Sequence, residues 1–317
     1  MFLASVISTF LAIMFSPLSL HMPTLRPIPS QSTAANNQSP VAAPAQGRLH
    51  LVARDKRKQF VTDLSADQLE LWVDGAKRHI EGLEPMPMEP IYVAYLMDIS
   101  GSRRDEDQNL ETEGIMDFFQ RVLARGGAAY AAAFSDQWIA GERTEGPSAL
   151  DREIRRLLSL PPHGGTALYD AVIRACYQMP ASESGRRAIV VVTDGKDNAS
   201  RNVIEEAVDA AQKTHTTIHV LLYSGDSRTR SRLSQKRASA AMKRLTLSAG
   251  GSALSFENRR QFKEALQTVE NELLEGYVLV YSPGVATDGK RIPKLKVKPL
   301  RKGIDVDVRL DLTLPKR

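Results

Sequence analysis

The chain has 317 residues, of which 42% are hydrophobic and 25% are charged, an ordinary balance for a globular protein. Its 42 Lys and Arg residues barely outnumber its 37 Asp and Glu residues, and aromatic residues make up only 6%. So small a charge excess, with so few rings for base stacking, argues against a nucleic-acid partner. The single cysteine, Cys176, excludes an intramolecular disulfide and a zinc site of several cysteines.

The first 22 residues predict a signal peptide or a membrane anchor. Residues 1–20 are uncharged and mostly apolar, which is typical of an export signal or a membrane segment. No Lys or Arg precedes this run and no clear cleavage site follows it, so cleavage and anchoring both stay open. We therefore expect an exported protein in the periplasm, in the cell envelope or secreted, with a possible membrane tether through this segment.

Residues 23–47 are rich in Pro, Ser, Ala, Asn and Gln, which predicts a disordered linker. An N-terminal β segment is expected over 48–86, with strands within 49–55 and 68–75 and a helical turn capped by Ser65. Prolines at 85, 87 and 90 end this segment.

Residues 87–276 alternate between apolar, β-branched runs and amphipathic stretches. Continuous apolar runs are typical of strands buried on both faces, and this alternation predicts an open, mostly parallel sheet covered by helices. The expected strands cover 91–97, 128–134, 187–193, 216–224 and 252–256, and the expected helices 108–124, 149–160, 166–179, 202–215 and 260–276, with a further helix ending at Gly250 and Gly251.

The C-terminal β segment, 277–317, breaks this rhythm. Alternating strands are expected within 277–283, 294–300 and 305–312. We expect them to form a meander with one solvated face, which pairs with the N-terminal segment as a small accessory β unit.

Five oxygen-bearing side chains are placed near strand ends. Asp98, Ser100 and Ser102 follow the first strand of the parallel sheet, Asp194 follows the strand 187–193, and Thr166 opens a helix after a glycine-rich loop. Because ligands bind beyond the carboxyl ends of parallel strands, these loops are expected to converge. Two carboxylates and three hydroxyls suit Mg²⁺, with Ca²⁺ or Mn²⁺ as alternatives. Such an ion keeps enough positive charge to take a carboxylate from a partner.

The segments "DISGS", "GGTALYD" and "VVVTDG" together resemble the von Willebrand factor type A (VWFA) domain and its metal-ion-dependent adhesion site. All five positions of that site match, at Asp98, Ser100, Ser102, Thr166 and Asp194. The flanking segments resemble the bacterial exported "VWFA-related" family, although "RDKRKQ" lacks that family's glycine and "GSRRDED" its methionine. The resemblance implies a Rossmann-like, doubly wound VWA domain over 87–276 that binds protein partners through a metal ion and is not an enzyme.

Simpler interpretations apply to the other polar residues. Asp136 and Asp197 also lie at strand ends, where turn or capping roles are favoured over orientation of the metal site. Asp170 is expected to be structural and His163 to be a surface loop residue. The basic run 227–244 is expected to be a solvated loop leading into a helix.

Two other functions stay open. A metal-dependent hydrolase could use the same ion to activate water, although the chain has neither Gly-x-Ser-x-Gly nor a phosphate-binding Gly-x-x-x-x-Gly-Lys-Ser/Thr loop. The second open function is a structural scaffold with a degenerate metal site. The function favoured is Mg²⁺-dependent protein binding or adhesion, with a partner that presents an Asp or Glu carboxylate.

Overall fold

The computed structural model describes residues 46–57, 59–101, 114–144, 146–180, 185–225, 232–282 and 294–310. The predicted signal peptide or anchor and nearly all of the linker lie outside the described residues, as do Ser102 and the start of the basic run. Within the described ranges, no helix has both the length and the apolar character needed to cross a membrane.

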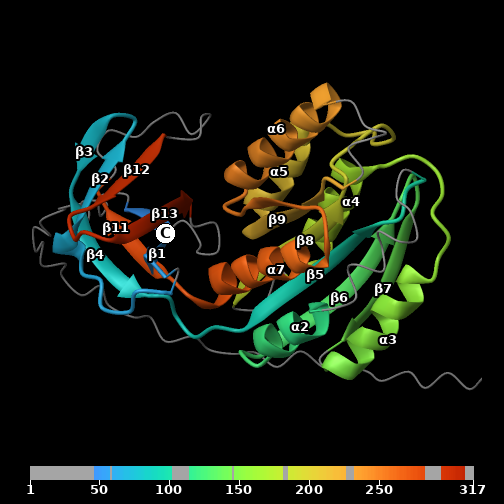
Figure 1. Ribbon diagram of the computed structural model, residues 1–317, viewed down its shortest axis with the longest axis horizontal. Coiled ribbons are helices and arrows are strands. Elements are labelled where there is room, and N and C mark those ends of the chain that lie inside the picture. Colours follow the sequence, from blue (N-terminus) through green and yellow to red (C-terminus); the bar gives the residue numbers. More distant parts are fainter. Residues whose placement is uncertain are drawn as a thin grey trace, which may run out of the picture. The chain divides into compact units, whose positions relative to one another are not determined.

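A six-stranded sheet forms the centre of the α/β part (Figure 1). Its strands are β5 (Ile91–Asp98), β6 (Gly127–Phe134), β7 (Trp138–Thr144), β8 (Arg186–Thr193), β9 (Thr216–Tyr223) and β10 (Ala253–Phe256). Their order is β10-β9-β8-β5-β6-β7, and every neighbouring pair is parallel except β6 and β7. Every residue of β5 and β8 is buried, which explains their continuous apolar runs.

Three helices pack on each face of this sheet (Figure 1). One face carries α2 (Ile115–Leu123), α3 (Pro147–Leu158) and α7 (Arg259–Leu274), and the other carries α4 (Leu168–Gln178), α5 (Ile204–Lys213) and α6 (Arg232–Ser248). Alternate residues of β5 serve the two cores: Tyr95 packs edge-on against Phe119 of α2, whereas Leu96 lies in the core with α4. This arrangement confirms the predicted Rossmann-like, doubly wound, mostly parallel sheet.

Local sequence explains where several helices begin. The side chain of Asn258 accepts a hydrogen bond of 3.1 Å from the backbone N–H of Gln261 and caps α7. Pro147 occupies the first position of α3, where its missing N–H costs nothing. Cys176 of α4 is fully buried, as expected, and burial raises the pKa of its thiol to about 12.

Two antiparallel sheets make up the accessory β unit. One contains β1 (Gly47–Asp55), β4 (Ile80–Pro85), β11 (Tyr277–Tyr281) and β13 (Ile304–Leu310), in the order β13-β1-β11-β4. The other contains β2 (Leu69–Val73), β3 (Ala76–Arg78) and β12 (Leu295–Pro299), in the order β12-β2-β3. The predicted helical turn is present as η1 (Ala66–Gln68), directly after Ser65.

The C-terminal strands pair with the N-terminal segment, as predicted, but the predicted meander is wrong. β11 and β13 lie on either side of β1, and β12 pairs with β2, so within the described ranges no two C-terminal strands are hydrogen-bonded to each other. The interleaving buries Leu49 and Leu51 of β1 with Leu279 of β11 in one core. The edge strand β7 was not predicted from the sequence, because its mixed "WIAGERT" pattern is weak.

A buried ionic cluster joins α7 to β13. The Glu272 carboxylate accepts two hydrogen bonds from the Arg309 guanidinium, at 2.5 and 2.8 Å, and one from the Ser252 hydroxyl at 2.9 Å. His219 Nδ1 of β9 lies 3.2 Å from the same carboxylate. Burial alone would raise the pKa of Glu272, but the hydrogen bonds from His219 and Arg309 outweigh it and hold that pKa well below its usual range.

Replacing Arg309 with Leu is expected to lower the free energy of unfolding by about 3–5 kcal/mol, because it leaves the Glu272 carboxylate buried without its charged partner. Urea unfolding of the full chain measures this. The matched control is Arg301→Leu, which breaks an exposed pair with Asp63 and should cost less than about 1 kcal/mol. Equal losses in the two variants would contradict the expectation.

The same cluster predicts a pH dependence of stability. The folded-state pKa of Glu272 is depressed, so its stabilisation is present above the unfolded value of about 4.3 and is lost as the pH falls below it. Urea unfolding between pH 7 and pH 3 should show a smaller loss of stability in Glu272→Gln than in the unmodified chain. Parallel losses in both would show that other groups govern acid sensitivity.

Candidate metal centre

The two predicted carboxylates lie at the ends of neighbouring parallel strands. Asp98 is the last residue of β5, and Asp194 follows directly after β8, with Met97 opposite Val192 in the register. From β5 the chain continues to β6 on one side, and from β8 it continues to β9 on the other. The gap between β5 and β8 is therefore the topological switch point, where open α/β sheets bind ligands.

Hydrogen bonds tie the end of β5 to the end of β8 and to the loop that follows β8. Asp98 is only 1% exposed. Its Oδ1 atom accepts a hydrogen bond of 2.9 Å from the Ser100 N–H, and its Oδ2 atom accepts one of 2.6 Å from the Thr193 hydroxyl. The Thr193 oxygen in turn accepts from the Gly195 N–H at 3.1 Å. The Thr193 hydroxyl therefore fixes the position of Asp98 relative to the loop that carries Asp194.

The loop that carries Thr166 is bonded to the loop after β5. The His163 N–H donates to the Ile99 carbonyl at 2.9 Å, and the Gly101 N–H donates to the Gly164 carbonyl at 3.1 Å. Gly164 has φ +69°, and a Cβ there would lie 2.1 Å from Asp136 Oδ1, so this close approach requires glycine.

The Thr166 loop is also bonded to the loop after β8. The Thr166 N–H donates to Asn198 Oδ1 at 2.7 Å, and the Asn198 N–H donates to the Thr166 carbonyl at 3.0 Å. Thr166 itself is 2% exposed. The three loops thus converge at one edge of the sheet, as expected from the sequence.

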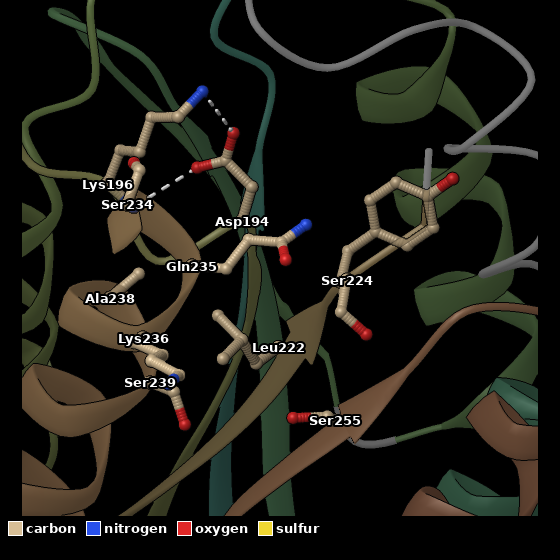
Figure 2. A pocket seen from close by; sticks show the side chains of 11 residues that line it. Asp194, Lys196, Leu222, Ser224, Ser234, Gln235, Lys236, Ala238, Ser239 and Ser255 are labelled. Carbon is tan, nitrogen blue, oxygen red and sulfur yellow. Dashed lines mark hydrogen bonds and ion pairs between the residues drawn. The ribbon is translucent and has the colours of Figure 1, made fainter. Parts of the chain in front are cut away.

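Asp194 is buried and is held by Lys196 (Figure 2). Its Oδ1 accepts from the Lys196 N–H at 3.1 Å, and its Oδ2 lies 3.3 Å from the Lys196 ammonium. The Lys196 side chain is 37% exposed, so its ammonium is a cation that can leave the carboxylate for solvent.

The donor set fits a hard divalent cation. The structure brings together the loops of Asp98, Ser100, Thr166 and Asp194, all buried, while Ser102 lies outside the described residues. Two carboxylates with neutral hydroxyls are the ligands that Mg²⁺ and Ca²⁺ prefer. Among the described residues, no group of three or more His, Cys, Asp or Glu side chains could hold a metal ion, so a site here needs the hydroxyls. The role of these residues as metal ligands stays a prediction.

Asp197 and Asp170 have structural roles, in line with the expectation. Asp197 Oδ2 accepts from the Tyr169 N–H at 3.0 Å and from the Ser200 hydroxyl at 2.5 Å. The Asp170 carboxylate accepts from the N–H groups of Arg201 and Asn202, each at 3.0 Å. Burial would raise the pKa of Asp170, but these hydrogen bonds lower it below its ordinary value. Both residues hold the loop between β8 and α5 against α4.

His163 and Asp136 are more closely involved with the site loops than a surface position implies. His163 Nε2 lies 3.2 Å from the Ser135 hydroxyl and Nδ1 lies 3.0 Å from the Pro161 carbonyl, so the half-buried ring bridges two loops. Asp136 is exposed, accepts from the Ser135 hydroxyl at 3.1 Å and abuts Gly164.

Sequence reasoning missed three residues that organise the site: Thr193, Lys196 and Asn198. All three lie in "VTDGKDN", beside Asp194. Thr193 ends an otherwise apolar strand, and this polar residue was the available signal. No sequence motif predicts the roles of Lys196 and Asn198, because these roles depend on the conformation of the loop after β8.

No family model matches the chain, and no curated protein matches it in sequence. Solved structures that are similar to it include von Willebrand factor type A domains. The von Willebrand factor type A protein from Catenulispora acidiphila is 11% identical, with 85% of this chain and 74% of that chain covered and a TM-score of 0.43.

Two further similar structures come from other bacteria. The vWF domain of the type V pili tip protein Mfa5 from Porphyromonas gingivalis is 12% identical, with 64% of this chain and 100% of that chain covered and a TM-score of 0.44. The conserved hypothetical protein BatB from Bacteroides thetaiotaomicron is 16% identical, with 57% of this chain and 96% of that chain covered and a TM-score of 0.44. At such identities the likeness concerns the fold, so any function has to come from the residues of the site.

Replacing Thr193 with Val keeps the shape of the side chain but removes the donor to Asp98. We expect the free energy of unfolding to fall by about 1–3 kcal/mol, because a buried carboxylate oxygen loses its hydroxyl donor. Thr217→Val on β9 is the control, since its half-buried hydroxyl donates a longer bond, 3.2 Å, to the neutral carbonyl of Arg187. Urea unfolding that shows equal losses would contradict a special role for Thr193.

Proposed function

We propose that the protein is an exported, metal-ion-dependent binding module that captures a carboxylate of a protein partner at this centre. The observation that carries the proposal is the burial of Asp98 and Asp194 at adjacent strand ends, with the Thr166 loop bonded to both of their loops. Mg²⁺ is the proposed ion, and Ca²⁺ or Mn²⁺ are alternatives.

The residues that would hold the ion are Asp98, Ser100, Ser102, Thr166 and Asp194. When bound, a divalent ion supplies a Lewis-acidic position that a partner's Asp or Glu oxygen can fill. The two aspartates supply the negative charge that attracts the cation. The hydroxyls supply neutral oxygens, so the centre keeps its attraction for one more anionic ligand.

Export is supported by the apolar run at residues 1–20 and by the polar linker that follows it. A binding role is favoured over catalysis because, among the residues that the structure describes, no general base stands out beside the carboxylates, and the nearby His163 is engaged by Ser135 and Pro161. Turnover of a phosphoester or peptide with Mg²⁺ or Mn²⁺ would instead favour the hydrolase.

Asp98→Asn and Asp194→Asn are each expected to weaken Mg²⁺ binding at least about tenfold, because each removes one of the two site charges without changing side-chain size. Isothermal titration calorimetry measures the affinity. In a thermal melt, Mg²⁺ should raise the melting temperature of the unmodified chain, and EDTA should reverse this.

The control for these variants is Asp209→Asn on α5, which removes an exposed carboxylate paired with Lys213. It should leave Mg²⁺ binding unchanged. If all three variants bind Mg²⁺ as the unmodified chain does, or if the unmodified chain binds none, the proposal fails and the degenerate scaffold is favoured.

Lys196→Met is expected to tighten Mg²⁺ binding about two- to fivefold, because it removes a competing positive charge 3.3 Å from Asp194 Oδ2. The effect should be modest, since the ammonium is partly solvated. Lys213→Met, which removes an exposed charge on α5, is the control for net charge. Calorimetry showing weaker Mg²⁺ binding in Lys196→Met would mean that the lysine supports the centre.

A further inference from the structure

A hollow of ≈ 380 Å³ lies beside the candidate metal centre (Figure 2). It is bounded by the loop after β8, the end of β9, the first turns of α6 and the strand β10. The described residues that line it are Asp194, Lys196, Leu222, Tyr223, Ser224, Ser234, Gln235, Lys236, Ala238, Ser239 and Ser255. Its volume is at the lower end of ligand pockets, which span roughly 300–1,000 Å³, so it suits a side chain or a small group.

The lining favours an anion. Besides the serine hydroxyls, it carries Lys196, Lys236 and the amide of Gln235. Among the described residues that line it, the one carboxylate is Asp194, which Lys196 already contacts. The Nε2 atom of Gln235 is buried and has no hydrogen-bond partner within the described part of the chain. A buried N–H₂ donor without an acceptor is costly, and an oxygen of a ligand would satisfy it. The amide belongs to α6, close to the helix N-terminus, where the helix dipole also favours negative charge.

The hollow and the metal centre share one wall. Asp194 lines the hollow and is a proposed metal ligand. Behind it, Gly195 has φ +76°, and a Cβ there would lie 2.5 Å from Leu222 Cδ1 and 3.2 Å from the Ala238 Cβ. Strand β9 and helix α6 therefore pack directly on the backbone of the loop that carries Asp194, and this fixes the hollow next to the centre.

We infer that this hollow accepts a second carboxylate of the same partner, from an acidic side chain near the one that the metal centre captures. The inference rests on the proposed function. Lys236 and the Gln235 amide would bind the carboxylate oxygens, and Leu222 and Ala238 would contact the methylene groups of a Glu side chain. When a cation occupies Asp194, the Lys196 ammonium loses its carboxylate and becomes available to the same anion. The ligand class is thus an acidic peptide segment with two neighbouring carboxylates.

The test uses the full chain and synthetic Gly-Ser peptides of equal length. One peptide carries a single Glu, and four others carry a second Glu one, two, three or four positions later. Affinities are measured by microscale thermophoresis with Mg²⁺ and with EDTA, at fixed ionic strength. At least one two-Glu peptide should bind about tenfold more tightly than the one-Glu peptide. That gain should disappear in Lys236→Glu.

Lys243→Glu is the matched control, because it makes the same charge change at an exposed position of α6 that does not line the hollow. The Lys243→Glu variant should still bind the two-Glu peptide more tightly than the one-Glu peptide. Gln235→Leu should reduce the gain while leaving the melting temperature of the free protein unchanged or higher, since it removes an unpartnered buried donor.

The outcomes separate the two proposals. If EDTA abolishes binding of the one-Glu peptide and no spacing gives a gain in affinity, the proposed carboxylate site in the hollow is wrong and the metal-dependent capture is supported. A gain that Lys236→Glu removes, with no effect of EDTA on the one-Glu peptide, supports the hollow and overturns the metal-dependent capture. If Lys236→Glu and Lys243→Glu reduce the gain equally, the gain comes from long-range attraction and the proposed carboxylate site in the hollow is wrong. The absence of binding by every peptide would also show that this proposal is wrong.

Discussion

The burial of two carboxylates at the ends of adjacent strands constrains the whole edge of the sheet. A buried carboxylate is unfavourable by several kcal/mol unless hydrogen bonds or a countercharge compensate it. Here the donors come from the end of β8 and from the loops after the two strands: the Ser100 N–H and the Thr193 hydroxyl for Asp98, and the Lys196 N–H and ammonium for Asp194. Because these donors lie at the end of β8 and in the loops after both strands, satisfying the charges also fixes the loops in one arrangement.

The same chain shows a different solution at Glu272. That carboxylate receives two guanidinium hydrogen bonds from Arg309, a residue 12% exposed, together with a hydroxyl and an imidazole. This cluster is closed, and its negative charge is compensated within the protein. At Asp194 the lysine is 37% exposed and 3.3 Å away, which is a looser pairing. The contrast distinguishes a carboxylate in a closed ionic cluster that joins two parts of the fold from one that is held by a partly exposed lysine.

Much of the α/β part could be predicted from sequence because its strands are buried on both faces, so their apolar runs are unambiguous. The placement of Asp98, Thr166 and Asp194 at one edge followed from the same logic, since parallel strands present their carboxyl ends together. The interleaving of β1 with β11 and β13 could not be predicted, because residues more than 220 positions apart pair only through tertiary packing. The pairing of Glu272 with Arg309 could not be predicted either, because the two residues belong to no sequence motif. The proposed role of Gln235 depends on its position in the hollow, which the sequence does not show.

In the proposed complex, long-range and short-range electrostatics act in the same direction. The chain carries a formal net charge of +5, and α6 presents exposed basic residues, among them Lys236, which lines the hollow, and Lys243, which does not. Such a field attracts an acidic partner at a distance and raises the rate of encounter, but it does not discriminate among acidic surfaces. Discrimination has to come from geometry: one carboxylate oxygen at the metal and a second acid at the hollow, both set by the rigid wall of Asp194 and Gly195. A partner with the right charge but the wrong spacing satisfies only one of the two positions.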